Sequence, residues 1–550
     1  MAPMRATSLL LLPSASEDAT SRHRGSRCLE RKYKLTSICE ADSVTPGFPQ
    51  LRRFGTSLFR TLRSNDLLLF ALLFPISVRA LPEILAGRWP LGTDTVWIYA
   101  PFLKSVNTQG LEKSLEDVFS LHGAPLFLVL LGSVEALVGA DPFLLIKAAA
   151  PLLHGFLVFS MFYFAKRGLD WDRRRCFLVV VLATLYFVPL RFSWDMYKNG
   201  FGLALLIMAF THLKSSPTWR DRGAFVAFAA MSILSSELTT LLIGAVAGVL
   251  FLFDRFRRDR WSVEIAVTSI VALFAAFVYA GVLFPVAPPA TPLAALPRGS
   301  MFPYDYVGAT DGMYSYASLA DVYAGVLVLS TIVLAPLVPF AWLGLHNERR
   351  LWAWSGILEV FAFSILVMPY AAIPVWHRWL FMLVFPLIFF NVQGLARYRR
   401  RIALLFVAGI IVLAASFLAL PPGSPLPYFA NPETLPYVPS SMMQNTVPLQ
   451  NCQEIVDAVR WLNGMPFNQS VLLAPISFFG WAELYSTIPR IYGFVSPRQV
   501  DGGNFSGYQH VLLLYWAPQQ GWYDPQLMPS GMAAIHVSGQ IAIYQRPAGA

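Results

Sequence analysis

A series of long apolar segments between residues 66 and 420 constrains this chain more than any other feature of its sequence. A helix needs about 20 mainly apolar residues to cross the hydrocarbon of a bilayer. The segments that meet or approach this length are 66–86, 142–165, 176–192, 199–213, 223–236, 238–253, 262–284, 321–345, 351–373, 379–396 and 402–420. Only 13% of the 550 residues are charged, whereas soluble domains contain about 25%. The sequence therefore predicts a polytopic α-helical membrane protein with about 11 transmembrane helices.

A shorter apolar run at 124–139, which contains Glu135, decides the orientation of the segments that follow it. If this run crosses the membrane, the basic cluster at 166–175 lies outside. If it lies along the outer interface or re-enters, the cluster lies inside, and the inside loops carry 18 Lys/Arg against 7 in the longer outside segments. Because basic residues concentrate in cytoplasmic loops, we expect the second arrangement, with loops 87–141 and 285–320 outside.

The two ends of the chain differ in composition from the apolar region. Residues 1–65 carry 11 Lys/Arg against 5 Asp/Glu, which predicts a disordered, basic cytoplasmic tail. The formal charge of +10 lies mostly in this tail and in the short inside loops, so it does not indicate nucleic-acid binding. The chain therefore reads as a multi-pass protein of the plasma or cell membrane, with its N-terminus in the cytoplasm and a membrane domain at 66–420.

After four closely spaced prolines, residues 421–550 contain no spanning segment and predict a small extracytoplasmic α/β domain. The expected elements are a helix near 451–463, strands at 470–474 and 510–515, and a hairpin of 534–537 and 540–544. The four cysteines show no paired spacing, and only Cys452 is expected outside, so we expect no structural disulfide there.

Ionisable residues from distant parts of the sequence gather on the predicted outer face. Asp94 follows the first helix, Asp195 lies in the turn after the third, and Glu237 lies in a turn between two short helices. His377 and Arg378 precede the tenth helix. Charged groups at membrane depth are costly unless paired or hydrated, so these residues are candidates for function. One carboxylate can take a proton from an acceptor hydroxyl while Arg378 neutralises a phosphate leaving group.

Each of these residues also has a plainer interpretation. Asp94 fits an ordinary loop or cap residue, because short turns that contain Asp are common. Asp195 fits a local ion pair with Arg191 or Lys198. The residues at 377–378 lie between two tryptophans, as interfacial anchors do.

These motifs, and their order along the chain, resemble those of the GT-C superfamily of membrane glycosyltransferases. This superfamily includes protein mannosyltransferases, aminoarabinose transferases and the oligosaccharyltransferase catalytic subunit. The matching motifs are Gly92-Thr93-Asp94, Arg191-Phe192-Ser193-Trp194-Asp195, His122-Gly123-Ala124-Pro125-Leu126 and Trp376-His377-Arg378-Trp379-Leu380, the last followed by Pro386. The resemblance covers about residues 66–400 and implies that a sugar is moved from a polyprenyl-phosphate-type lipid carrier to an acceptor hydroxyl on the outer face.

The resemblance also implies roles for the carboxylates. Asp94 would be the general base, and Asp195 and Glu237 would position the acceptor or bind metal. A divalent cation, Mg or Mn, would use Asp94 and Asp195, although the second motif holds one Asp where the family has a pair.

The remaining roles concern the donor and the substrates. Arg378, with His377, would bind the carrier phosphate. Tyr304, Asp305 and Tyr306 would form a loop over the pocket, where aromatic rings and a carboxylate suit a sugar. The partners implied are a lipid-linked sugar donor, the membrane, and a glycan, lipid or protein acceptor.

Two other classes of function remain open. A non-enzymatic transporter or flippase of lipid-linked sugars would explain the membrane domain, although such proteins often show internal repeats and midplane sites, which the sequence lacks. A scaffold that binds a partner through its outer domain would leave the clustered acids unexplained.

Overall fold

The computed structural model describes residues 64–92, 94–120, 123–214, 217–257, 262–279, 319–345, 348–367, 376–398, 400–419, 447–467, 469–494, 496–518 and 525–546. All of them belong to one compact unit of the chain, Leu62–Ala550. The predicted tail at 1–65, except for its last two residues, the loop at 285–320, except for its last two, and the residues Tyr304, Asp305 and Tyr306 lie outside the described residues.

Helices occupy each of the apolar segments identified above, wholly or in part. They are α2 (Ser64–Leu85), α6 (Pro142–Tyr163), α7 (Arg173–Leu185) with α8 (Phe187–Phe192), α9 (Tyr197–His212), α10 (Trp219–Ser235), α11 (Glu237–Arg257), α12 (Ser262–Val278), α14 (Leu319–Leu334) with α15 (Val338–Leu343), α16 (Arg349–Val367), α17 (Trp376–Ala396) and α18 (Arg400–Ala419). Within the described residues, five helices are long and apolar enough to cross a membrane, and four shorter helices are also apolar. The chain is thus a helical integral membrane protein, while the number of eleven crossings stays a prediction.

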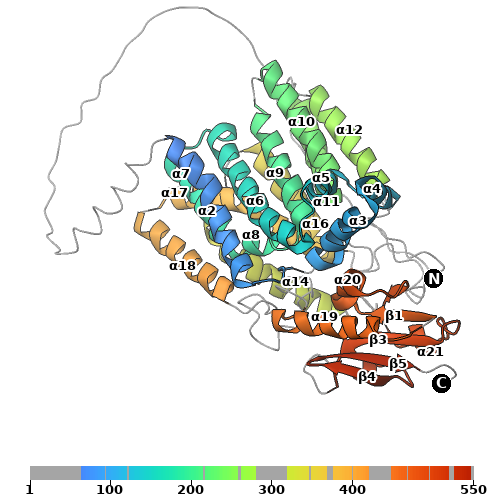
Figure 1. Ribbon diagram of the computed structural model, residues 1–550. Helices are drawn as coiled ribbons and strands as arrows, with labels where there is room; N and C mark the ends of the chain where they lie inside the picture. Colours follow the sequence, from blue (N-terminus) through green and yellow to red (C-terminus); the bar gives the residue numbers. More distant parts are fainter. Residues whose placement is uncertain are drawn as a thin grey trace, which may run out of the picture. The chain divides into compact units, whose positions relative to one another are not determined.

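Helices that pack against each other are not always neighbours in the sequence. Helix α6 lies between α2 and α9, and α17 contacts α7, α15 and α16 (Figure 1). Helix α7 ends at Tyr186, whose extended backbone (ψ 131°) separates it from the short α8. This break directs α8 and the turn after it toward the end of α2, and the candidate site forms there.

Short helices connect α2 to α6. They are η1 (Thr95–Tyr99), which is a single π-helical turn, α3 (Ala100–Gln109), α4 (Leu111–Ser120) and α5 (Leu126–Val138). At about 1.5 Å per residue, the 13 residues of α5 extend about 20 Å, less than the hydrocarbon thickness of about 30 Å. Glu135 of α5 is buried and accepts a hydrogen bond from Asn107 Nδ2 of α3 at 2.5 Å. That α5 does not cross the membrane stays a prediction from the distribution of basic residues.

The C-terminal residues form a mixed five-stranded sheet with two main helices. In chain order the elements are α19 (Leu449–Asn463), β1 (Ser470–Ala474), α20 (Ile476–Tyr485), β2 (Ile491–Gly493), α21 (Arg498–Asp501), β3 (His510–Trp516), η7 (Pro525–Leu527), β4 (Ala533–Ser538) and β5 (Ile541–Arg546). The strand order is β2-β1-β3-β5-β4 (Figure 1). Strand β1 is parallel to β2 and β3, and β5 is antiparallel to β3 and β4. The helix, the two strands and the hairpin expected from the sequence are α19, β1, β3 and β4–β5.

Two hydrophobic cores hold the described residues together. One lies among the membrane helices. The other combines Val96 and Leu103 from the segment after α2 with Val456, Phe478 and Leu513 from the C-terminal elements. Residues separated by more than 300 positions in the sequence therefore share one core.

Candidate active site

Three connecting segments meet at one end of the helices. We call residues 91–99 the first loop, residues 191–199 the second turn and residues 235–240 the third turn. The Oγ1 atom of Thr95 lies 3.2 Å from Tyr197 Oη, and Tyr197 Oη donates a hydrogen bond to the Trp194 carbonyl oxygen at 2.6 Å. The backbone N–H of Lys198 donates to Tyr99 Oη at 3.2 Å. These bonds join the first loop directly to the second turn.

Gly92 allows the first loop to approach the second turn closely. Its φ is +86°, a conformation that L-residues other than glycine rarely adopt. A β-carbon at Gly92 would lie 2.6 Å from the Trp194 carbonyl oxygen and 2.6 Å from the Asp195 β-carbon. Glycine is therefore required here both for the backbone angle and for the contact with the turn that carries Asp195.

Asp94, which is buried, forms an ion pair with the partly buried Arg378 in the first turn of α17. The distance from Arg378 Nη2 to Asp94 Oδ2 is 3.1 Å, and Asp94 is 6% exposed. The residues lie 284 positions apart, so only the packing of α17 against the other helices brings them together. The structure thus pairs the predicted base with the predicted phosphate ligand.

The surroundings of Asp94 change its acidity in opposite directions. Burial raises the pKa of the Asp94 carboxyl to about 6, while the positive charge of Arg378 acts to lower it. Asp195 lies close enough for its negative charge to raise the pKa of Asp94 further, and Arg191 opposes that effect. A carboxylate with a pKa near 6 is ionised at neutral pH and is a stronger base than an ordinary aspartate.

Asp195 is held by a two-pronged ion pair with Arg191. The Nη1 and Nη2 atoms of Arg191 lie 2.8 Å and 3.1 Å from the two carboxylate oxygens of Asp195, and both side chains are buried. The pairing with Arg191 is the local ion pair that the sequence left open as an alternative. Lys198, the other candidate partner, turns away from Asp195 toward the third turn.

Glu237 connects the second and third turns to the segment before α5. Its Oε1 atom lies 2.6 Å from Lys198 Nζ and accepts a hydrogen bond from the backbone N–H of Ala124 at 2.8 Å. Beside it, Ser236 Oγ donates to Asn199 Oδ1 at 2.5 Å. Glu237 therefore has a clear structural role, whatever it contributes to chemistry.

A second buried network supports the first loop and the second turn from behind. Arg79 donates to Glu83 at 2.7 Å and, through Nε and Nη2, to the Ser193 carbonyl oxygen at 3.3 Å. Lys147 Nζ donates to Glu83 Oε2 at 3.0 Å and to the Trp89 carbonyl oxygen at 2.9 Å. Sequence reasoning missed these residues, although three charges inside apolar segments were a usable signal.

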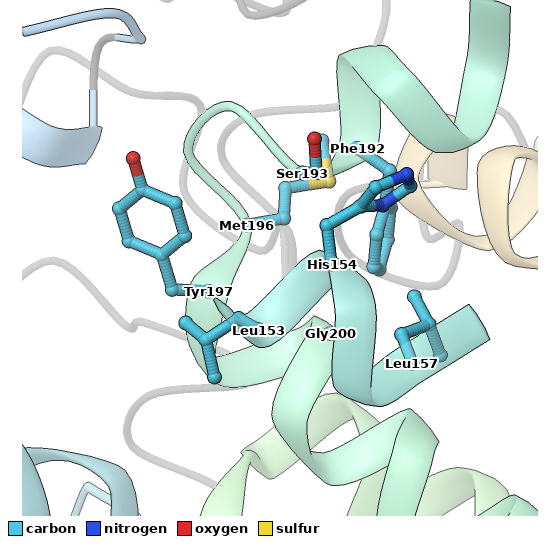
Figure 2. A pocket seen from close by; sticks show the side chains of 8 residues that line it. All are labelled: Leu153, His154, Leu157, Phe192, Ser193, Met196, Tyr197 and Gly200. Carbon is cyan, nitrogen blue, oxygen red and sulfur yellow. The ribbon is translucent and has the colours of Figure 1, made fainter. Parts of the chain in front are cut away.

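A small cavity lies behind the second turn. It is lined by Leu153, His154, Leu157, Phe192, Ser193, Met196, Tyr197 and Gly200. Figure 2 shows the ring of His154 projecting from α6 toward the turn. Asp94, Asp195 and Arg378 are not among these lining residues, so the cavity belongs to the packing behind the site.

His377, the other residue predicted at the donor phosphate, is fully buried. Its ring lies edge-on to that of Trp376, with ring centroids 6.0 Å apart.

Within the described part of the chain, no three His, Cys, Asp or Glu side chains gather as a set of metal ligands. The carboxylates of Asp195 and Glu237 each face a cation of the protein itself, so these residues do not fit a shared metal ion in this arrangement.

The fold described above is similar to that of solved structures. It is similar to the crystal structure of ArnT from Cupriavidus metallidurans bound to undecaprenyl phosphate, with a TM-score of 0.50 and 12% sequence identity, over 88% of this chain and 99% of that chain. It is also similar to the cryo-EM structure of the arabinofuranosyltransferase AftD from Mycobacteria, with a TM-score of 0.46 and 13% identity, over 87% of this chain and 40% of that one. No protein-family model and no curated protein sequence matches the chain. The chain therefore has a GT-C-like fold, as its motifs suggested.

Proposed function

We propose that this membrane protein transfers a sugar from a polyprenyl-phosphate-type carrier to an acceptor hydroxyl at the outer face of the membrane. The observation that carries the proposal is the ion pair of buried Asp94 with Arg378, which places a base of raised pKa beside a guanidinium. The fold adds support, because ArnT, which shares it, was crystallised with undecaprenyl phosphate.

In the proposed reaction, Asp94 accepts the proton of the acceptor hydroxyl. The hydroxyl oxygen then forms a bond to the anomeric carbon of the sugar, and the bond from that carbon to the phosphate oxygen breaks. The carrier phosphate leaves with the bonding electrons, and Arg378 stabilises its added negative charge. A guanidinium suits this role because it forms charge-assisted, two-pronged hydrogen bonds to phosphate.

The pairing of Arg378 with Asp94 also couples donor binding to the state of the base. A phosphate that binds Arg378 competes with Asp94 for the same guanidinium. Binding of the donor therefore loosens the attraction that lowers the pKa of Asp94, so that the carboxylate becomes more basic when the donor is present. Asp195 and Glu237, held by Arg191 and Lys198, set the shape of the turns that receive the acceptor.

We assign no step to a divalent cation, because the nearby carboxylates are already paired with cations of the protein. Chelation tests whether the donor phosphate brings a divalent cation that the reaction needs. If EDTA abolishes transfer and Mg or Mn restores it, a metal takes part, and Asp94 is the first residue to examine as its ligand. Tyr304, Asp305 and Tyr306 keep their proposed role over the pocket as a prediction from sequence.

The test of the proposed function uses the purified protein in lipid vesicles with a panel of radiolabelled polyprenyl-phosphate sugars. We expect wild-type protein to consume at least one carrier and to form a labelled glycoside when acceptor hydroxyls are supplied. Movement of an intact labelled carrier between leaflets, without cleavage of its sugar–phosphate bond, would instead identify a flippase.

A further inference from the structure

Helix α20 lies between the C-terminal sheet and the first loop. On one side, Phe478 of α20 packs edge-on against Trp516 of β3, with ring centroids 5.0 Å apart. On the other side, α20 contacts η1 and α3, and residues of all three elements belong to one hydrophobic core. A single helix thus connects the sheet to the segment that carries Asp94.

Gly480 brings the backbone of α20 against the backbone of the first loop. A β-carbon at Gly480 would lie 2.7 Å from the Val96 carbonyl carbon and 2.8 Å from the Trp97 α-carbon. Because both are backbone atoms, rotation of a side chain cannot relieve this overlap. Any larger residue at position 480 must therefore displace η1, α20 or both.

Trp481 contacts the chain on the other side of Asp94. Its ring centroid lies 5.4 Å from that of Trp89, at an interplanar angle of 77°, and 5.8 Å from that of Phe143. Trp89 precedes Asp94 by five residues, whereas Val96 follows it by two. Adjacent residues of α20 therefore contact the chain both before and after the aspartate.

Lys104 fixes the far end of α20. Its Nζ atom donates hydrogen bonds to the carbonyl oxygens of Glu483 and Leu484, at 3.1 Å and 2.7 Å, in the last turn of the helix. Such a cation satisfies carbonyl groups that a helix leaves without partners and matches the helix dipole. Since α3, which carries Lys104, directly follows η1, both ends of the contact are anchored to the same short stretch of chain.

We propose that α20 positions Asp94, and that Gly480 and Trp481 are positioning residues that hold the first loop in register with Arg378. This inference rests on the proposed function, in which Asp94 must meet the acceptor hydroxyl while Arg378 meets the donor phosphate. A displacement of a catalytic group by about 1 Å can reduce the rate about 100-fold. The C-terminal domain thus takes part in the reaction without touching the substrate.

Gly480→Ala in the full-length protein tests the proposal. We expect kcat per folded molecule to fall about 100-fold while the donor KM does not rise, because Asp94 moves and Arg378 does not. The matched control is Gly493→Ala in β2, where a β-carbon meets no atom within 4 Å. A purely structural contact would lower the yield of folded protein but leave turnover per folded molecule at the wild-type value, and that result would overturn the proposal.

Two milder variants cover the case in which Gly480→Ala does not fold. Trp481→Phe keeps an apolar ring but shortens the contact with Trp89, and Lys104→Met releases the end of α20. We expect each to lower kcat without raising the donor KM, and wild-type kcat in both would overturn the proposal.

A fluorescence measurement separates this proposal from the proposed function. Trp97 in η1 is 37% exposed, so Trp97→Cys, with Cys28 and Cys39 replaced by Ser, provides a site for a bimane label. The other two cysteines are buried. We expect Gly480→Ala to shift the bimane emission and Gly493→Ala to leave it unchanged. An unchanged emission overturns the positioning role whatever the activity, whereas a wild-type protein that forms no glycoside overturns only the proposed function.

Discussion

Asp94 stays buried because Arg378 lies beside it. An isolated carboxylate removed from water is costly, and the usual outcome is either a paired charge or a raised pKa. Asp94 shows both, since the guanidinium is 3.1 Å away and the pKa of the carboxyl rises to about 6. The residue is therefore not a solvated loop aspartate.

Replacement of Asp94 by Asn tests the proposed base directly. Asn keeps the shape and most hydrogen bonds but cannot accept the proton, and general-base catalysis contributes about 100- to 10,000-fold. We expect transfer to slow by that order while donor binding and folding persist. The control is Asp457→Asn on the exposed side of α19. Full transfer by a folded Asp94→Asn protein would remove this residue from the mechanism.

The pH dependence of transfer reports the same carboxylate. Because the pKa of Asp94 is raised to about 6, the group is ionised and able to accept a proton above that pH and is protonated below it. We expect kcat/KM to be level above pH 6 and to fall about tenfold per pH unit below it. The acid limb should vanish in Asp94→Asn, and a limb that persists there belongs to another group.

Arg378→Lys separates charge from geometry at the donor site. Lysine keeps the positive charge but cannot form two parallel hydrogen bonds to phosphate. The loss of one charge-assisted contact costs about 1.5–3 kcal/mol, so we expect the donor KM to rise at least tenfold. Equal donor KM and kcat in Arg378→Ala and wild type would reduce Arg378 to a partner of Asp94.

At the scale of the elements, the three connecting segments are held together by a close backbone contact and an ion pair. The first loop touches the second turn at Gly92, and Lys198 joins the second turn to Glu237 of the third. Each segment carries one of the predicted carboxylates. The relative positions of the three carboxylates therefore depend on the contacts between these segments.

Gly92→Ala should disrupt the joint between the first loop and the second turn. The left-handed backbone alone costs about 1–2 kcal/mol for a residue with a β-carbon, and the overlap with Trp194 adds to it. Gly87→Ala is the matched control, because Gly87 has a φ of +62° but no atom within 4 Å of the added carbon. We expect Gly92→Ala to lower Tm and kcat more than Gly87→Ala, and equal losses would show that only backbone angle matters.

The ion pair of Lys198 and Glu237 should contribute to stability more than an exposed pair does. Lys198 and Glu237 are partly buried, with side chains 16% and 10% exposed, so removing one partner loses a charge-assisted hydrogen bond that contributes about 1.5–3 kcal/mol. We expect Glu237→Gln to lower the free energy of unfolding by about that amount and the double variant with Lys198→Met to recover part of it. Glu264→Gln, which breaks the more exposed pair with Arg222, should cost about 1 kcal/mol or less.

At the scale of the whole molecule, the long apolar helices, α19 and four of the five strands were predictable, whereas α3, α20, β2 and the long-range contacts were not. Apolar length identified the helices, and alternation with a turn signal identified the β4–β5 hairpin, because both are local patterns. The residues Asp94, Asp195, Glu237 and Arg378 were predicted as one site from sidedness alone. The ion pair of Lys198 with Glu237 and the contact of Gly480 with Val96 have no local pattern, since each depends on the path of the chain between distant elements.

The predicted topology places the first loop and the C-terminal domain on the same outer side. Cys452 is buried, so labelling requires an exposed position such as Asp457→Cys in α19. A membrane-impermeant maleimide should label Asp457→Cys in intact cells but not Arg174→Cys in the predicted inside loop at 166–175. Labelling of Arg174→Cys under these conditions would reverse the orientation of the membrane domain.

The core that the first loop shares with the C-terminal elements also has a consequence for the synthesis of the protein. The ribosome completes residues 91–99 roughly 350 residues before it completes α19 and the strands that pack with them. At about 5–20 residues per second, that interval lasts tens of seconds. During this time the segment with Asp94 lacks the apolar partners that the C-terminal elements supply. We therefore expect a chain that stops before α19 to insert its helices without the contacts that hold this segment in place.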